Sequence, residues 1–237
     1  MPDKAKRGVV YFVWGREIWG QDTGHFLKRS IQSLHRFHPD MPVQVFRLPP
    51  EATLLEKAVV FRATPFEETL FLDIDTIVLD RLDFGFEQAR RFGLACCINE
   101  SPWARRYGGL SGDMVEYNTG VLFFSRQAEA VFTRWEQCVR NTDSSMQFWR
   151  DGELKVMPLN DQAGFARAVA ETGFNPFVLP LNWNYRTPFH QEFFGPLKIW
   201  HSYTEVPEKI KAFNEEQCRQ ESVIRFSAGD RFTVVRL

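Results

Sequence analysis

The order of elements in residues 9–75 predicts an α/β fold built on a mostly parallel sheet. Short apolar runs typical of buried strands alternate there with segments whose apolar residues recur at helical spacing. Strand, helix, strand, helix and strand follow one another, which is the pattern of parallel strands joined by right-handed crossovers. In such sheets ligands bind beyond the carboxyl ends of the strands, so those ends are where functional residues are expected.

Each element of this N-terminal unit has a local signal. The first apolar run ends at Gly15, and the second ends at Pro49-Pro50, so both have the length of buried strands. The first helical segment stops where Pro39 interrupts the pattern. The expected strands are residues 9–14, 43–48 and 69–72, and the expected helices are residues 24–36 and 54–62.

The second half of the chain is less regular but continues the same mixture of elements. Strands are expected at residues 94–98, 120–124 and 198–201, helices at residues 128–139, 162–170 and 207–220, and an edge strand at residues 232–235. No internal repeat, low-complexity tract or linker interrupts the chain. We therefore expect a single domain over residues 1–237.

The composition is that of an ordinary globular chain. Of its 237 residues, 44% are apolar and 25% are charged, which is enough apolar material for a buried core. The 29 Lys and Arg against 30 Asp and Glu give a net charge of −1, which argues against nucleic acid as a partner. Phe accounts for 23 of the aromatic residues, and most of these are expected in the core.

The ends and the cysteines favour a cytoplasmic protein. No apolar run reaches the roughly 18 residues of a membrane span, and the N-terminus lacks the pattern of a signal peptide. Cys96 and Cys97 are adjacent, which suits neither a disulfide framework nor a C-x-x-C metal site. With Cys138 and Cys218 they are expected to be reduced and mostly buried.

The strongest chemical signal is the pair of aspartates that follows an apolar strand, Asp73 and Asp75. Residues two apart in an extended segment point to the same side, so the two carboxylates repel each other unless a positive charge lies between them. A divalent cation supplies that charge, and oxygen ligands favour Mg²⁺ or Mn²⁺. The simpler alternative, two solvated surface acids, is weakened by the position at a predicted carboxyl edge.

Two unrelated chemistries use this string. In one, both aspartates hold a cation on the diphosphate of a sugar nucleotide. In the other, the string D-x-D-x-T of haloacid dehalogenase-like phosphatases carries a nucleophile and an acid/base. Asp73 and Asp75 match its D-x-D, with Thr76 one position earlier than in the string. Those phosphatases carry the motif on their first strand and complete it with a later acidic cluster. Neither condition is met here, so the phosphatase stays the second hypothesis.

The chain resembles the metal-dependent nucleotide-sugar glycosyltransferases of the GT-A fold, and among them the family 8 (galactosyltransferase/glycogenin-like) enzymes. The matching segments are residues 10–14 (VYFVW), Lys57, 64–75 (TPFEETLFLDID), 117–122 (YNTGVL), 160–162 (NDQ) and 199–203 (IWHSY). They extend over most of the chain. The resemblance implies a mixed, mostly parallel sheet flanked by helices. It also implies a nucleotide-binding half at about 9–100, an acceptor and catalytic half at about 101–205, and a C-terminal helix and tail at 206–237.

The resemblance implies a metal and nucleotide site. Asp73 and Asp75 would bind Mn²⁺ or Mg²⁺ on the donor diphosphate, and His201 would be the third ligand, although a lone histidine is more often structural. Lys57 would neutralise a phosphate as a point charge. The indole of Trp14 would stack on the nucleotide base, with core burial as the alternative.

It also implies a group around the transferred sugar. Asn118 and Gly120 would approach the sugar hydroxyls, or simply form a turn into a strand. Asp161 and Gln162 would lie beside the reacting carbon, although Asp161 is also placed to be a helix N-cap. The aromatic face of Trp183 would stack on carbohydrate, or be packed in a loop.

The implied reaction is transfer of a hexose from a nucleoside diphosphate sugar, with UDP as the expected nucleotide, to an acceptor hydroxyl. The acceptor, a carbohydrate, a lipid-linked sugar or a protein, is expected to enter over loops 102–117 and 182–191, near Trp103, Tyr107 and Tyr185. A non-catalytic sugar-nucleotide-binding role is a third hypothesis. The sequence leaves the retaining or inverting outcome and the oligomeric state open.

Overall fold

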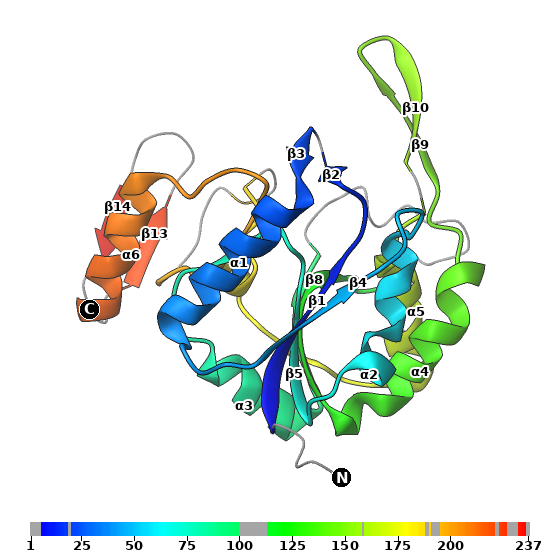
Figure 1. Cartoon of the computed structure of the whole chain (residues 1–237), viewed down its shortest axis with the longest axis horizontal. Coiled ribbons are helices and arrows are strands. Elements are labelled where there is room, and N and C mark those ends of the chain that lie inside the picture. The colour runs from blue at the N-terminus through cyan, green and yellow to red at the C-terminus, as the bar shows by residue number, and fades with distance from the viewer. Residues whose placement is uncertain are drawn as a thin grey trace.

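A six-stranded sheet forms the centre of the protein, whose computed structural model is shown in Figure 1. The structure describes residues 6–18, 20–99, 113–157, 159–187, 190, 195–220, 223–226 and 232–235. The sheet has the order β11-β7-β8-β5-β1-β4. Its strands are β1 (Arg7–Val13), β4 (Val43–Arg47), β5 (Glu68–Leu72), β7 (Leu94–Ile98), β8 (Tyr117–Ser125) and β11 (Phe177–Val178).

One strand of this sheet is reversed. β1 lies parallel to β4 and β5, and β11 lies parallel to β7, whereas β8 runs antiparallel to both of its neighbours. The predicted mixed, mostly parallel sheet is therefore confirmed. Because β8 is reversed, its first residues lie beside the last residues of β5, and Val121 is paired with Leu72. This reversal decides which side chains meet at the carboxyl end of β5.

Helices cover both faces of the sheet (Figure 1). One face packs against α1 (Thr23–Phe37) and α3 (Asp83–Phe92), and the other packs against η1 (Leu54–Val59), α2 (Val60–Ala63), α4 (Glu129–Cys138) and α5 (Gln162–Thr172). Strand β1 contributes to both layers, since Tyr11 belongs to the cluster under α1 and Phe12 to the cluster under α4 and α5. A strand buried on both faces must be apolar throughout, which is why its sequence lacks alternation.

A second, two-stranded sheet lies next to the carboxyl end of β5. β6 (Thr76–Val78) pairs antiparallel with β12 (Ile199–His201), so a segment near the end of the chain returns to the middle of it. Helix α6 (Glu208–Gln220) packs Ile210 and Phe213 against this small sheet. The strand expected at residues 198–201 therefore exists, but it lies outside the main sheet.

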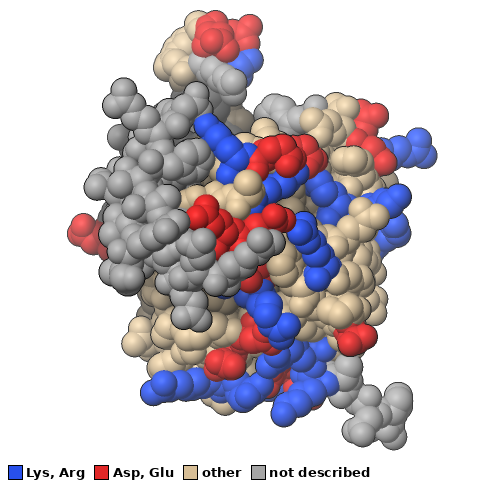
Figure 2. Space-filling view, turned by 90° about the vertical axis from the view of Figure 1, so that its left-hand side faces the viewer, with Lys and Arg blue, Asp and Glu red and all other residues tan. Residues whose placement is uncertain are grey.

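The remaining elements are short. They are β2 (Glu17–Ile18), β3 (Gln21–Asp22), η3 (Arg126–Ala128), η4 (Val139–Asn141), β9 (Met146–Arg150), β10 (Glu153–Met157), η5 (Leu181–Trp183), β13 (Val223–Phe226) and β14 (Phe232–Val235). The β9–β10 hairpin projects away from the body of the molecule (Figures 1 and 2). On the face shown in Figure 2, Lys and Arg side chains are mixed with Asp and Glu, as the net charge of −1 suggests.

Three local predictions are corrected. The helix expected at 54–62 is a 3₁₀ helix, η1, followed by the one-turn helix α2. The tail strand at 232–235 forms as β14, but it pairs with β13 and not with the edge of the main sheet. The sequence analysis predicted neither helix α3 nor the β9–β10 hairpin.

The described cysteines are buried, as expected. Cys96, Cys97 and Cys138 lie in the core, and none of the three forms a disulfide. Burial raises the pKa of the Cys138 thiol, so this group is not primed as a nucleophile. Within the described residues, no helix combines the length and the apolar character that crossing a membrane requires.

Candidate functional site

Asp73 and Asp75 follow β5 directly, at the carboxyl end of the strand. The backbone N–H of Asp73 donates to the carbonyl of Gly120 in β8 at 2.8 Å. A Cβ atom at Gly120 would lie 2.4 Å from Cε1 of His201 and 2.6 Å from Oδ2 of Asp73. Glycine is therefore required here because the backbone of β8 passes directly behind both side chains.

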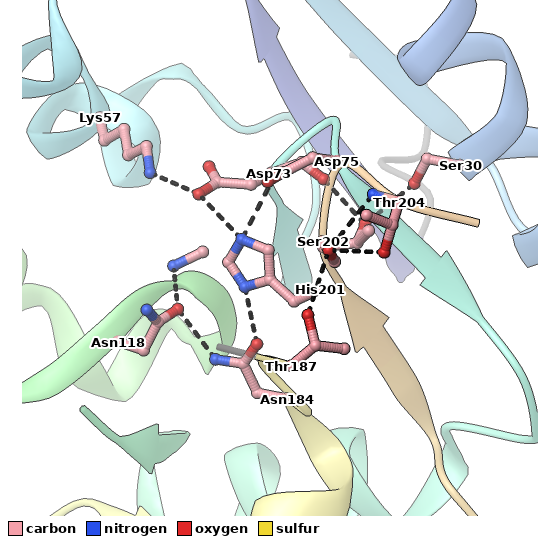
Figure 3. Close-up of polar contacts among 12 residues, drawn as sticks. Ser30, Lys57, Asp73, Asp75, Asn118, Asn184, Thr187, His201, Ser202 and Thr204 are labelled. Atoms are coloured by element: carbon pink, nitrogen blue, oxygen red, sulfur yellow. Dashed lines mark hydrogen bonds and ion pairs between the residues drawn. The ribbon is translucent and has the colours of Figure 1, made fainter. Parts of the chain in front are cut away.

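His201 reaches the two aspartates through the β6–β12 sheet, in which it pairs with Thr76. Its Nε2 atom lies 3.4 Å from Oδ1 of Asp75 and 3.8 Å from Oδ2 of Asp73 (Figure 3). The candidate ligand atoms of the three residues all lie within 4.8 Å of one another. Ligand atoms that share one divalent ion at about 2 Å lie at most about 4 Å apart, and both distances from Nε2 of His201 to the carboxylates are within that limit.

Lys57 brings a positive charge to the same group from η1. Its Nζ atom donates to Oδ2 of Asp73 at 2.7 Å, and its side chain is only 4% exposed. Burial alone would lower the pKa of Lys57, but attraction to Asp161, Asp73 and Asp75 outweighs it and raises the pKa. Burial likewise opposes ionisation of Asp75, yet His201 and Lys57 hold its pKa below the usual range.

The residues present fit a divalent cation. Two carboxylates and an imidazole are acceptable ligands for Mn²⁺ or Mg²⁺, although the nitrogen ligand favours Mn²⁺. The Nδ1 atom of His201 is engaged with Oδ1 of Asn184 at 2.7 Å, so it is Nε2 that faces Asp73 and Asp75. Metal-ligating histidines are typically held in this way by a partner on the other ring nitrogen.

Asp161 and Gln162 form the opposite wall of the site. The hydroxyl of Thr119 donates to Oδ2 of Asp161 at 2.5 Å, and burial raises the pKa of this carboxyl. The side chain of Asp161 does not cap α5, because the backbone N–H of Gln162 is accepted by Oδ1 of Asn160 at 3.1 Å. Asp161 therefore occupies the N-cap position of α5, as the alternative expects, but without a capping hydrogen bond from its side chain, and it lines the cleft.

These side chains line one cleft of about 310 Å³. It contains every predicted metal ligand, together with Lys57 and the four predicted residues of the opposite side, Asn118, Gly120, Asp161 and Gln162. The complete lining is Leu54, Lys57, Asp73, Asp75, Asn118, Thr119, Gly120, Asn160, Asp161, Gln162, Arg186, His201, Ser202 and Tyr203.

Trp14 lies beside this cleft. It lines a smaller hollow of about 70 Å³ that shares Asp73, Asp75 and Tyr203 with the cleft. The indole is half-buried, with one part packed on the apolar cluster that contains Phe12. Core packing, the alternative for Trp14, is thus met in part, and stacking on a nucleotide base stays a prediction.

Trp183 is elsewhere, and the prediction that it lines the site is wrong. Its side chain is 5% exposed and packs in the core, with its ring 5.8 Å from that of Phe123. The next residue, Asn184, is the one that enters the site, where it contacts His201 and Asn118. Tyr185 is also buried, in the cluster under α6. The predicted acceptor residues Trp103 and Tyr107 lie outside the described residues.

Arg186 and Tyr203 also line the cleft. The sequence analysis places them in loop 182–191 and in segment 199–203 but gives neither residue a role of its own. Arg186 Nη1 donates to Oδ1 of Asn99 at 2.9 Å, and Asn99 Nδ2 donates to Oε1 of Glu116 at 2.6 Å. Asn99 directly follows the predicted strand 94–98, and Glu116 and Arg186 lie in the loops 102–117 and 182–191 that are expected near the acceptor. These positions were the only sequence signal for the three residues, because no periodicity marks them.

The mixed six-stranded sheet with helices on both faces is that of the GT-A fold, as the comparison with solved structures shows. No family model and no curated protein matches the sequence. Among solved structures, the chain is similar to the apo form of mouse xyloside xylosyltransferase 1. That match has a TM-score of 0.54 and 13% identity, over 86% of this chain and 100% of that chain.

The chain is also similar to the galactosyltransferase LgtC in complex with donor and acceptor sugar analogues. This match has a TM-score of 0.49 and 13% identity, over 89% of this chain and 96% of that chain. The xylosyltransferase match confirms the predicted resemblance at the level of the fold. At such low identity it shows the fold alone, so the activity has to be argued from the site.

Proposed function

We propose that the protein is a glycosyltransferase that moves a hexose from a nucleoside diphosphate sugar, with UDP as the expected nucleotide, to an acceptor hydroxyl. The observation that carries this proposal is the convergence of Asp73, Asp75 and His201 on one cleft, with Lys57 beside them. Three acids, counting Asp161, face a single lysine there. A divalent cation would offset that negative surplus and would in turn attract the negative diphosphate of a donor.

In this proposal Asp73, Asp75 and His201 hold Mn²⁺ or Mg²⁺. When bound, the ion would neutralise the charge that develops on the departing diphosphate. Lys57 contributes a second positive charge at the floor of the cleft, where burial keeps its ammonium in one place. The hollow beside Trp14 is directly continuous with the metal ligands, which supports placing the nucleotide base there.

The transferred sugar would then lie against the opposite wall. Asn118, Asp161 and Gln162 line that wall, and their amide and carboxylate groups suit sugar hydroxyls. Gly120 acts by leaving room for the metal ligands behind it. The acceptor would enter from the open side of the cleft, as a carbohydrate, a lipid-linked sugar or a protein. The cytoplasmic location stays a prediction.

A thermal-shift panel tests the proposal. UDP, GDP, CDP and several sugar nucleotides are each added with Mn²⁺, with Mg²⁺ and with EDTA. At a hundredfold excess over Kd, a ligand stabilises the protein by about 2.7 kcal/mol, or about 5–10 °C in Tm for a chain of this size. We expect UDP and a UDP-sugar to raise Tm only when metal is present.

The same panel separates the alternatives. If no nucleoside diphosphate raises Tm with metal present, the transferase proposal is wrong. Release of phosphate from a phosphomonoester with an acyl-phosphate on Asp73 would instead support the phosphatase. Nucleotide binding with no consumption of any sugar nucleotide, with or without added acceptors, would support a non-catalytic binding protein.

A further inference from the structure

We propose that Asn184 is a positioning residue that keeps a hydrogen on Nδ1 of His201, so that Nε2 is the nitrogen left to bind a metal ion beside Asp73 and Asp75. The inference deepens the proposed function and rests on it for its use, since a metal ligand must present an unprotonated nitrogen. The role of Asn184 does not follow from the sequence segment that contains His201, because Asn184 lies 17 residues before His201.

The argument begins at a group whose polarity is certain. The backbone N–H of Gly120 can only donate, and it lies 3.0 Å from the Oδ1 atom of Asn118. The side-chain atom of Asn118 at that position must therefore be the oxygen. The amide of Asn184 contacts this same oxygen at 2.8 Å, so Asn184 must present its Nδ2–H₂ group there.

The orientation of Asn184 then decides the tautomer of His201. With its nitrogen facing Asn118, Asn184 turns Oδ1 toward the imidazole, 2.7 Å from Nδ1 (Figure 3). A carbonyl oxygen accepts, so Nδ1 must carry the hydrogen. The other nitrogen, Nε2, faces the two carboxylates and is the one at which a metal ion would take the place of a hydrogen.

The other end of the hydrogen-bond chain requires the same orientation. Nδ2 of Asn118 donates to Oε1 of Gln162 at 3.0 Å, and Nε2 of Gln162 donates to Oε1 of Glu116 at 3.2 Å. The carboxylate of Glu116 accepts, so Gln162 must direct its nitrogen toward it. Two anchors on different residues, Gly120 and Glu116, thus impose one polarity on every amide between them.

Burial makes this polarity costly to reverse. Asn118 is 4% exposed, Asn184 is 1% exposed and Glu116 is 3% exposed. Turning either asparagine by 180° would place two donors or two acceptors face to face in a site with little water, at the cost of an unmade buried hydrogen bond. The opposite tautomer of His201 would also put Nε2–H where the metal is expected to bind.

Two measurements test the inference. Long-range ¹H–¹⁵N NMR spectra of the metal-free protein at about pH 8, where an ordinary imidazole is neutral, report the tautomer of each histidine. The His201 signals are identified by their loss in His201→Ala. Titration calorimetry with Mn²⁺ alone then gives the metal affinity of the wild type, of Asn184→Ala and of the control Asn182→Ala.

We expect the Nδ1–H tautomer at His201 in the wild type, and a Kd for Mn²⁺ that is about 10- to 100-fold weaker in Asn184→Ala. Asn182→Ala should match the wild type, because the Asn182 side chain donates to the carbonyl of Pro196 and is outside the chain of amides. A His201 with no hydrogen on Nδ1 in the wild type, or an unchanged Kd in Asn184→Ala, overturns the inference.

The outcomes separate this inference from the proposed function. If the wild type binds no Mn²⁺, the proposed function loses its metal, while the tautomer in the metal-free protein still tests the role of Asn184. If the wild type binds Mn²⁺ and the tautomer is Nε2–H, only the role of Asn184 is wrong. The tautomer measurement needs no folded Asn184 variant.

Discussion

The two ends of strand β5 place buried acids in opposite settings. At the amino end, Glu68 is 5% exposed and both of its oxygens are occupied by arginines. Arg90 Nε lies 2.6 Å from Oε1, and Arg7 Nη2 lies 3.2 Å from Oε2. At the carboxyl end, Asp73 and Asp75 share one lysine and one histidine.

The difference is one of charge balance. Glu68 is a single negative charge between two guanidinium groups, and although burial would raise its pKa, the hydrogen bonds from Arg90 and Arg7 hold it below the usual range. Asp73, Asp75 and Asp161 place three carboxylates around Lys57. An acid that is already fully paired stabilises the fold, whereas a surplus of buried acid is a site for a cation.

The largest expected effect comes from removing a ligand at the carboxyl end. Asp75→Asn keeps the shape of the side chain but removes one charge and weakens the ligand. We expect the Mn²⁺-dependent shift in Tm to disappear and transfer activity to fall at least about a thousandfold, since a catalytic metal contributes several kcal/mol to the transition state. Full activity and a normal Mn²⁺ shift in Asp75→Asn would contradict the assignment of the site.

Alanine substitutions of two glycines, one at each end of the comparison, should have the next largest effects. Gly120→Ala places a Cβ 2.4 Å from Cε1 of His201, and Gly8→Ala places one 2.4 Å from the ring of Phe66. A displacement of about 1 Å at the site costs about a hundredfold in rate, so Gly120→Ala should lose activity and Mn²⁺ affinity.

Gly8→Ala is the matched control, because the overpacking there lies in the core. We expect it to lower the free energy of unfolding by about 1–3 kcal/mol and to leave Mn²⁺ affinity unchanged. Urea unfolding and Mn²⁺ calorimetry on both variants check the pair. If both variants lose metal affinity equally, the effect of Gly120→Ala is not local to the site.

Removing the acid at the amino end should affect stability alone. Glu68→Gln leaves Arg7 and Arg90 without their charged partner. Because the Arg90 side chain is 51% exposed and stays solvated, we expect a loss of only about 1–2 kcal/mol in the free energy of unfolding. Urea unfolding measures it, and calorimetry should give a wild-type Kd for Mn²⁺. A weaker metal affinity in Glu68→Gln would show that the two ends are coupled.

The smallest expected effect is the pH dependence of the unfolding free energy that Glu68→Gln loses. The lowered pKa of Glu68 means that its contribution to stability is fully present above the unfolded value of about 4.3 and is lost as pH falls through the folded value. The difference in unfolding free energy between wild type and Glu68→Gln should therefore shrink between about pH 5 and pH 3. A difference that stays constant over this range would mean that the carboxylate charge is not its source.

Local patterns predicted the main elements because their causes are local. β7 was predicted with its observed bounds, since a continuous apolar run can only be a strand buried on both faces. Helix α3 was missed because Gly85 lowers helix propensity, and the reason for that glycine is tertiary. A Cβ there would lie 2.7 Å from the ring of Phe123.

The β9–β10 hairpin, in contrast, had a usable local signal. Asp151 and Gly152 form its turn with φ values of 54° and 78°, and Asp-Gly between extended segments favours such a turn. The residues around this turn mix apolar and charged types, and Trp149 is 73% exposed. No pattern of buried residues therefore marked the two strands of the hairpin.

For the candidate site, the sequence by itself determined the two carboxylates, because an i, i+2 pair after an apolar strand needs no partner to be recognised. Only the tertiary structure decided that His201 meets them through β6–β12 pairing and that Trp183 turns into the core while Asn184 turns into the site. The reversed direction of β8 likewise placed Gly120 behind the ligands. The physical reason is that side-chain periodicity extends over a few residues, whereas the strand pairings that bring Gly120 and His201 to the site join residues 49 (Leu72 and Val121) and 125 (Thr76 and His201) apart in the sequence.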